Sequence, residues 1–180
     1  MITNIAFKAK SSYLNSRDRS DIENYLATTK ARRAALDEVR RLTTPAVDKL
    51  INRMRAAYPQ FTKFHNQAFE KGHRDMVLLT QMTANAMFLG EHDTLQDMFA
   101  EWYRTILKSV HMSPQFMNDT FTTWQEELQS TLSDESWSLM RPHVEYLSKY
   151  LTNVPVPARD ETGERKPLPP LAPGAKTWKS

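Results

Sequence analysis

Apolar residues recur at every third or fourth position through much of the chain, which is the spacing of one face of an α-helix. Three stripes stand out: Val47, Leu50, Ile51, Met54 and Tyr58; Leu95, Met98, Phe99, Trp102, Ile106 and Val110; and Met117, Phe121, Trp124 and Leu128. The strong alternation of apolar and polar residues that indicates strands is not seen. The pattern therefore predicts an all-α fold.

Capping residues place the first two helices. Ser20 and Glu23 have the spacing of a capping box, so a helix is expected to begin there and run to about Leu42. Thr44 followed by Pro45 predicts the N-cap and first residue of the next helix. The first half of the domain is thus expected to be a pair of consecutive helices.

Glycine, proline and serine residues mark the later boundaries. They predict that a helix stops at Pro59, that Gly72 is a junction, and that the next helix runs from about His73 to Leu89 and is ended by Gly90. A further helix is expected to start at Asp93 or Thr94, and another to be capped by Ser113 and Pro114. The last helix is expected to be capped by Ser133 and kinked or split at Pro142. Six or seven helices in about 135 residues favour a compact globin-like arrangement over a regular bundle of long helices.

The pattern divides the chain into three parts. Residues 1–19 are expected to be an N-terminal arm, and residues 20–152 the helical domain. Residues 153–180 are rich in proline and lack helical periodicity, so they are expected to form a disordered tail. The PLPPLAP stretch of this tail could instead dock on a partner as polyproline II helix.

Composition narrows the class of protein. The chain has 180 residues, of which 40% are hydrophobic and 25% charged, and this is the composition of an ordinary globular protein. No apolar run reaches the roughly 18 residues of a membrane span, and no signal-peptide pattern opens the chain, so we expect a cytoplasmic protein without membrane contact. The net charge of +3 is small and basic residues do not alternate with aromatic ones, so no nucleic acid partner is expected.

Candidate chemistry is sparse. The chain lacks a phosphate-binding glycine loop, histidines paired at i, i+4 and a nucleophile motif, so no enzymatic role is expected. His73, His92 and His111 flank the most apolar helices, and one neutral imidazole is enough to ligate haem. The adjacent Arg74 and Asp75 either are a charge pair at the start of a helix or contact a ligand.

Two short motifs carry a resemblance to a known family. Gly72-His73-Arg74-Asp75 is followed by Gly90-Glu91, and Met112-Ser113-Pro114-Gln115-Phe116 comes later. At this spacing, from about residue 24 to 151, the chain resembles a phycobiliprotein subunit, closest to the α type. The resemblance implies a globin-like fold preceded by an N-terminal helical hairpin.

The sequence departs from that family at one decisive position. Gly72 occupies the place of the cysteine that attaches the bilin, and the chain has no cysteine anywhere. A thioether bond to a bilin is therefore impossible, and any bilin is expected to be held non-covalently. In this respect the chain resembles the cysteine-free bilin-biosynthesis-associated globins, which implies a carrier, storage or handover role beside bilin-making enzymes.

The resemblance also implies site residues. Asp75 would accept hydrogen bonds from the pyrrole N–H groups of the bilin, while Arg74 and Lys71 would pair with its propionates. Phe116 stands where the family has a tryptophan beside the terminal ring, and Met98 where a tyrosine touches the chromophore. His73 adjoins this set and is also the first of the alternative haem ligands.

Two alternatives to a bilin carrier stay open at this point. The first is a haem-binding globin, acting as a sensor or haem carrier through His73, His92 or His111. The second is a helical assembly protein without a pigment. For any of the three functions, the resemblance implies association through the N-terminal helices, and we expect a homodimer. An apolar face on these helices supports it: Ile22, Tyr25, Leu26, Leu36 and Val39.

Overall fold

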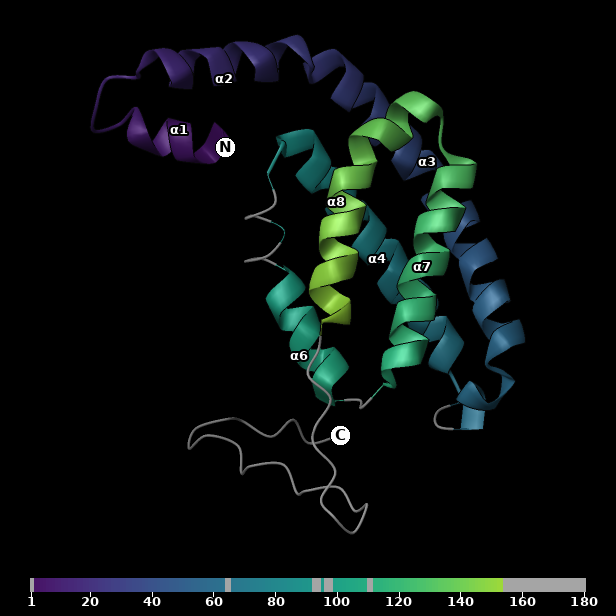
Figure 1. Ribbon diagram of the computed structural model, residues 1–180. Coiled ribbons are helices and arrows are strands. Elements are labelled where there is room, and N and C mark those ends of the chain that lie inside the picture. The colour runs from purple at the N-terminus through teal and green to yellow at the C-terminus, as the bar shows by residue number, and fades with distance from the viewer. Residues whose placement is uncertain (1, 64–65, 92–94, 96–98, 110–111, 154–180) are drawn as a thin grey trace, which may run out of the picture.

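In the computed structural model, the residues described are 2–63, 66–91, 95, 99–109 and 112–153. Their regular structure is entirely helical (Figure 1), which confirms the predicted all-α class. The elements are α1 (Ile2–Lys8), α2 (Ser16–Ala27), α3 (Thr29–Ala57), the 3₁₀-helix η1 (Pro59–Lys63), α4 (Ala68–Leu89), α6 (Glu101–Ser109), α7 (Pro114–Thr131) and α8 (Asp134–Thr152). None of the helices described is both long and apolar enough to cross a membrane.

The core lies where four helices meet. Among the residues described, the closest helix packing joins α3 to α4, α7 and α8, α7 to α8, and α4 to α8. Trp124 is nearly fully buried in this core, and its indole N–H donates to the Thr80 hydroxyl at 2.9 Å. The stripe of Met117, Phe121, Trp124 and Leu128 is buried as predicted, which fixes the orientation of α7.

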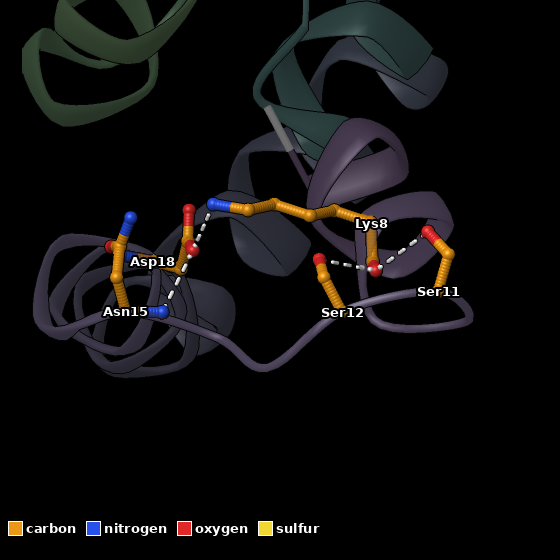
Figure 2. A network of polar contacts seen from close by, with 5 residues as sticks. All are labelled: Lys8, Ser11, Ser12, Asn15 and Asp18. Carbon is orange, nitrogen blue, oxygen red and sulfur yellow. Dashed lines mark hydrogen bonds and ion pairs between the residues drawn. The ribbon is translucent and has the colours of Figure 1, made fainter.

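The N-terminal hairpin lies earlier in the chain than predicted. α1 folds back beside α2, and the hairpin extends from one end of the domain (Figure 1). Asn15, not Ser20, is the N-cap of α2, because Asn15 and Asp18 form the reciprocal capping box. Figure 2 shows Lys8 of α1 reaching Asp18 at 2.5 Å across the connection. The predicted helix start at Ser20 was therefore wrong.

The predicted break at Thr44 and Pro45 was also wrong. α3 runs without interruption from Thr29 to Ala57 and contains Pro45. The break falls instead at Thr28, whose hydroxyl donates to the Asn24 carbonyl at 3.0 Å and competes with helical bonding. Pro45 is tolerated because it is exposed, while Ala46 and Val47 beside it are buried in the core.

The apolar face expected on the hairpin is smaller than predicted. Leu36 and Val39 are buried within the core of the same chain, so they cannot take part in a dimer face. Ile22 and Tyr25 are half-buried, and Leu26 is 63% exposed.

Arg32 joins the base of the hairpin to the end of α4. Its buried guanidinium donates to the carbonyl of Phe88 at 3.0 Å and to that of Tyr25 at 2.8 Å. It also lies 3.9 Å from the centre of the Tyr25 ring. Gly90 ends α4 with φ of 68°, as the sequence predicted.

Of the remaining predicted helix boundaries, some were correct and others were wrong. Ser113 and Ser133 cap α7 and α8 as predicted. α4 begins at Ala68, so Gly72 lies inside this helix and the predicted junction was wrong. α8 also continues through the exposed Pro142 and is not split there.

Candidate functional site

Helix α4 carries the predicted site residues on two different flanks. His73 and Asp75 are two positions apart, which turns their side chains by about 200° relative to each other around the helix. Figure 1 shows α6 at the left edge of the domain and the C-terminal part of α3 at the right edge. Asp75 is close to Tyr103 of α6, whereas His73 contacts Asp48 of α3. The structure therefore does not bring His73 and Asp75 together.

Asp75 and Arg74 form one charged group on the α6 flank. The Asp75 side chain is 34% exposed, the Arg74 side chain is 75% exposed, and the Arg74 Nη2 to Asp75 Oδ1 distance is 3.4 Å. Such an exposed pair contributes little to stability, so Arg74 can turn to another anion at small cost. Both residues lie beyond the first turn of α4, which rules out the interpretation of a charge pair at the helix start.

Tyr103 of α6 lies within the electrostatic influence of the same carboxylate. Burial, and then the negative charge of Asp75, raise the pKa of the Tyr103 phenol, so this group stays neutral and can donate a hydrogen bond. The Tyr103 ring stacks on Phe99 with 5.3 Å between ring centres. The flank thus combines a carboxylate with a neutral phenol.

Sequence reasoning missed Tyr103. It placed Trp102 on the buried face, but Trp102 is 59% exposed while Tyr103 and Leu107 are buried. Phe99 and Ala100 are the described residues of a π-helical segment that precedes α6, and both are buried. The signal available was the spacing of four residues that links Phe99, Tyr103 and Leu107.

Charged and apolar groups adjoin along the exposed side of this flank. Lys71 lies one turn before Asp75, and Leu78, which is 43% exposed, lies one turn after Arg74. Together these residues offer two cations, one carboxylate and an apolar surface. A ligand that suits them has N–H donors, anionic groups and an apolar body.

The opposite flank of α4 faces α3. His73 Nε2 lies 2.9 Å from Asp48 Oδ1, and both line an open groove of about 320 Å³. The other lining residues are Ile51, Asn52, Arg55, Phe69 and Glu70. Within the part of the chain described, no group of three or more metal-binding side chains occurs.

Phe116 packs with the aromatic residues that follow α3. Its ring stacks on Phe61 at 4.5 Å and meets Tyr58 edge-on at 5.0 Å. Phe61 in turn contacts Phe69 of α4. The ring contacts of Phe116 are thus made with this cluster. The predicted site residues Met98, His92 and His111 lie outside the residues described.

Comparison with protein families connects this arrangement to known proteins. The family model described as phycobilisome protein matches residues 5–151. The chain belongs to the phycobilisome protein family. This finding confirms the resemblance drawn from the motifs around Asp75 and Pro114, and the helical fold is the globin-like fold of phycobiliproteins. Comparison with curated proteins found no match.

The position two residues before the Arg74-Asp75 pair is the one at which the resemblance placed the attachment cysteine. Gly72 stands there, half-buried inside α4, and a Cβ atom at this position would lie 3.8 Å from Ile51 Cδ1, an ordinary contact. Space therefore does not require glycine at position 72. With no cysteine in the sequence, the thiol chemistry of covalent pigment attachment is absent.

Proposed function

We propose that this phycobilisome-family protein binds a bilin, a linear tetrapyrrole, without a covalent bond. The observation that carries the proposal is the half-buried carboxylate of Asp75, which pairs with the exposed Arg74 at 3.4 Å and acts electrostatically on the buried Tyr103. Membership in a family of pigment proteins supports the same ligand class.

The side chains fit the chemistry of a bilin. Asp75 would accept hydrogen bonds from pyrrole N–H groups, and a carboxylate that accepts several such bonds stays ionised. The cations Arg74 and Lys71 would pair with the propionates, Arg74 through its planar guanidinium. Leu78 would cover apolar ring surface. The pigment itself would supply light absorption when bound.

Reversible binding favours transport over permanent light harvesting. Because no cysteine can hold the pigment, release needs only that non-covalent contacts break. We therefore propose a carrier, storage or handover role, with bilin-making enzymes as partners. His73 Nε2 contacts Asp48 on the other flank of α4, so this histidine is not part of the proposed site. A scaffold role without pigment would not use the charged flank.

Substitution of Asp75 tests the proposal. We expect Asp75→Asn to weaken biliverdin binding about 10- to 100-fold, since hydrogen bonds to a charged group contribute about 1.5–3 kcal/mol. The bound spectrum should also shift, because the carboxylate stabilises the protonated pigment. Absorption titration of the purified protein with biliverdin measures both effects.

Asp48→Asn is the matched control, because Asp48 is the carboxylate on the opposite flank of α4. It should leave biliverdin affinity and spectrum unchanged. Equal losses in the two variants, or wild-type binding by Asp75→Asn, would refute the assignment of the site.

We further propose that the protein forms a homodimer through its N-terminal hairpin. Phe7 of α1 is 74% exposed and Leu26 of α2 is 63% exposed. Exposed large apolar side chains on one projecting element are typical of an association surface.

A further inference from the structure

Helix α6, which carries Tyr103, is held differently from the core helices. It is not among the closely packed helix pairs of the residues described. Its side chains Tyr103 and Leu107 are buried, and Tyr103 lies within the electrostatic influence of Asp75. The position of this helix therefore depends strongly on its side-chain contacts.

Its outer surface contacts the C-terminal end of α8 through four residues, Glu101, Arg104, Tyr150 and Asn153, which we call the α6–α8 cluster. The Tyr150 hydroxyl donates to Glu101 Oε1, and this bond raises the pKa of Tyr150. Arg104 Nη2 donates to the backbone carbonyl of Asn153 at 2.8 Å. The Arg104 guanidinium also lies 5.0 Å from the centre of the Tyr150 ring.

Arg104 and Tyr103 are neighbours on one short helix. A helical turn is rigid, so a rotation or shift of α6 moves both side chains together. Contacts that fix Arg104 on α8 therefore also fix the position of Tyr103.

We infer that Arg104 and Tyr150 are positioning residues that fix α6 on α8, and with it Tyr103 on the flank of α4 that carries Asp75, and so set how firmly this flank retains its ligand. The inference rests on the bilin site proposed above for its effect on the ligand. The part of the inference that concerns the position of α6 does not depend on any pigment.

Arg104→Gln and Tyr150→Phe test the inference in the full chain. The first removes the guanidinium with little change in helix propensity, and the second removes only the hydroxyl. Each should raise amide hydrogen exchange across residues 99–109 of the pigment-free protein roughly 3- to 10-fold, as expected for the loss of one or two hydrogen bonds. The biliverdin dissociation rate should rise by a similar factor.

Arg141→Gln is the matched control, because Arg141 forms an exposed ion pair with Glu145 within α8 at 2.7 Å. This substitution should change neither the amide exchange across residues 99–109 nor the biliverdin dissociation rate. Unchanged exchange across 99–109 in the two cluster variants would overturn the inference, whatever the pigment does. Faster exchange with an unchanged biliverdin dissociation rate would overturn the link to the ligand. If the wild-type protein binds no biliverdin, the proposed function fails, and the exchange measurement alone still decides whether the cluster positions α6.

Discussion

At the scale of single residues, Glu38 is a structural carboxylate with an unusual number of partners. It lies on α3 and accepts hydrogen bonds from the start of α8: from the Ser133 backbone N–H and hydroxyl, both at 2.8 Å, and from the Ser136 hydroxyl at 2.5 Å. These bonds, that of Ser136 first, hold the pKa of Glu38 below its ordinary value of 4.5. Ionised Glu38 therefore stabilises the folded state.

We predict that Glu38→Gln lowers the free energy of unfolding by about 1–3 kcal/mol at pH 7. Because the folded pKa is depressed, the contribution of Glu38 is fully present above its unfolded value of 4.5 and is lost as pH falls through the lower folded value. Urea unfolding at several pH values measures this. The gap between wild type and variant should narrow below pH 4.5, while Glu135→Gln, at an exposed position in the first turn of α8, should leave stability nearly unchanged.

Among the candidate site residues, those in local motifs could be predicted and those set by distant contacts could not. Arg74 and Asp75 follow from a four-residue motif, and they lie together on α4. Tyr103 was missed because the periodicity of this segment allows either Trp102 or Tyr103 on the buried face, and only tertiary packing decides between them.

At the scale of elements, α3 shows how packing overrides a local signal. Thr44 and Pro45 have the sequence of a helix start, yet both are exposed in the middle of a 29-residue helix. Pro45 has no N–H to donate to the carbonyl of Arg41, one turn before it, and both residues are exposed, so water can reach that carbonyl. Burial of the residues around this site keeps the helix continuous.

Two substitutions distinguish a continuous helix from a helix start. Pro45→Ala should raise the free energy of unfolding by about 1–2 kcal/mol, because alanine restores an N–H donor inside a helix. Thr44→Ala should leave stability unchanged or raise it by a few tenths of a kcal/mol, whereas the loss of an N-cap costs about 1 kcal/mol. Thermal or urea unfolding of the two variants decides, and a destabilised Thr44→Ala would contradict the continuous helix.

The boundaries that were predicted correctly are those with a complete local cause. Ser113 and Ser133 accept backbone N–H bonds three residues later, and Gly90 adopts the left-handed conformation that favours glycine. Gly72 and Pro142 carry signals of the same kind but lie within helices, since long helices packed on a core absorb an unfavourable residue.

At the scale of the whole molecule, the all-α class and the globin-like fold could be predicted because helical periodicity runs through most of the domain. The position of the hairpin could not, because α1 carries only seven residues and its pairing with α2 depends on contacts such as Lys8 with Asp18. The expected division into residues 1–19, 20–152 and 153–180 stays a prediction.

The proposed homodimer makes a prediction at this scale. Leu26→Gln should shift the protein toward monomer in sedimentation velocity, because it removes an exposed apolar side chain from the hairpin. Leu78→Gln, which changes an exposed leucine of α4, should leave the monomer–dimer ratio at its wild-type value. A wild-type protein that stays monomeric at all concentrations would contradict the proposal.

The hydrogen bond from Arg104 to Asn153 ends on a backbone carbonyl. No side-chain substitution at position 153 deletes that acceptor, so scanning mutagenesis of the α8 terminus would pass over it. Only truncation removes this carbonyl. The family match ends at residue 151 and the expected domain ends at residue 152, so a chain cut at either boundary would lack it. A chain shortened to residue 152 would keep every core residue of α8 and still leave Arg104 without this partner.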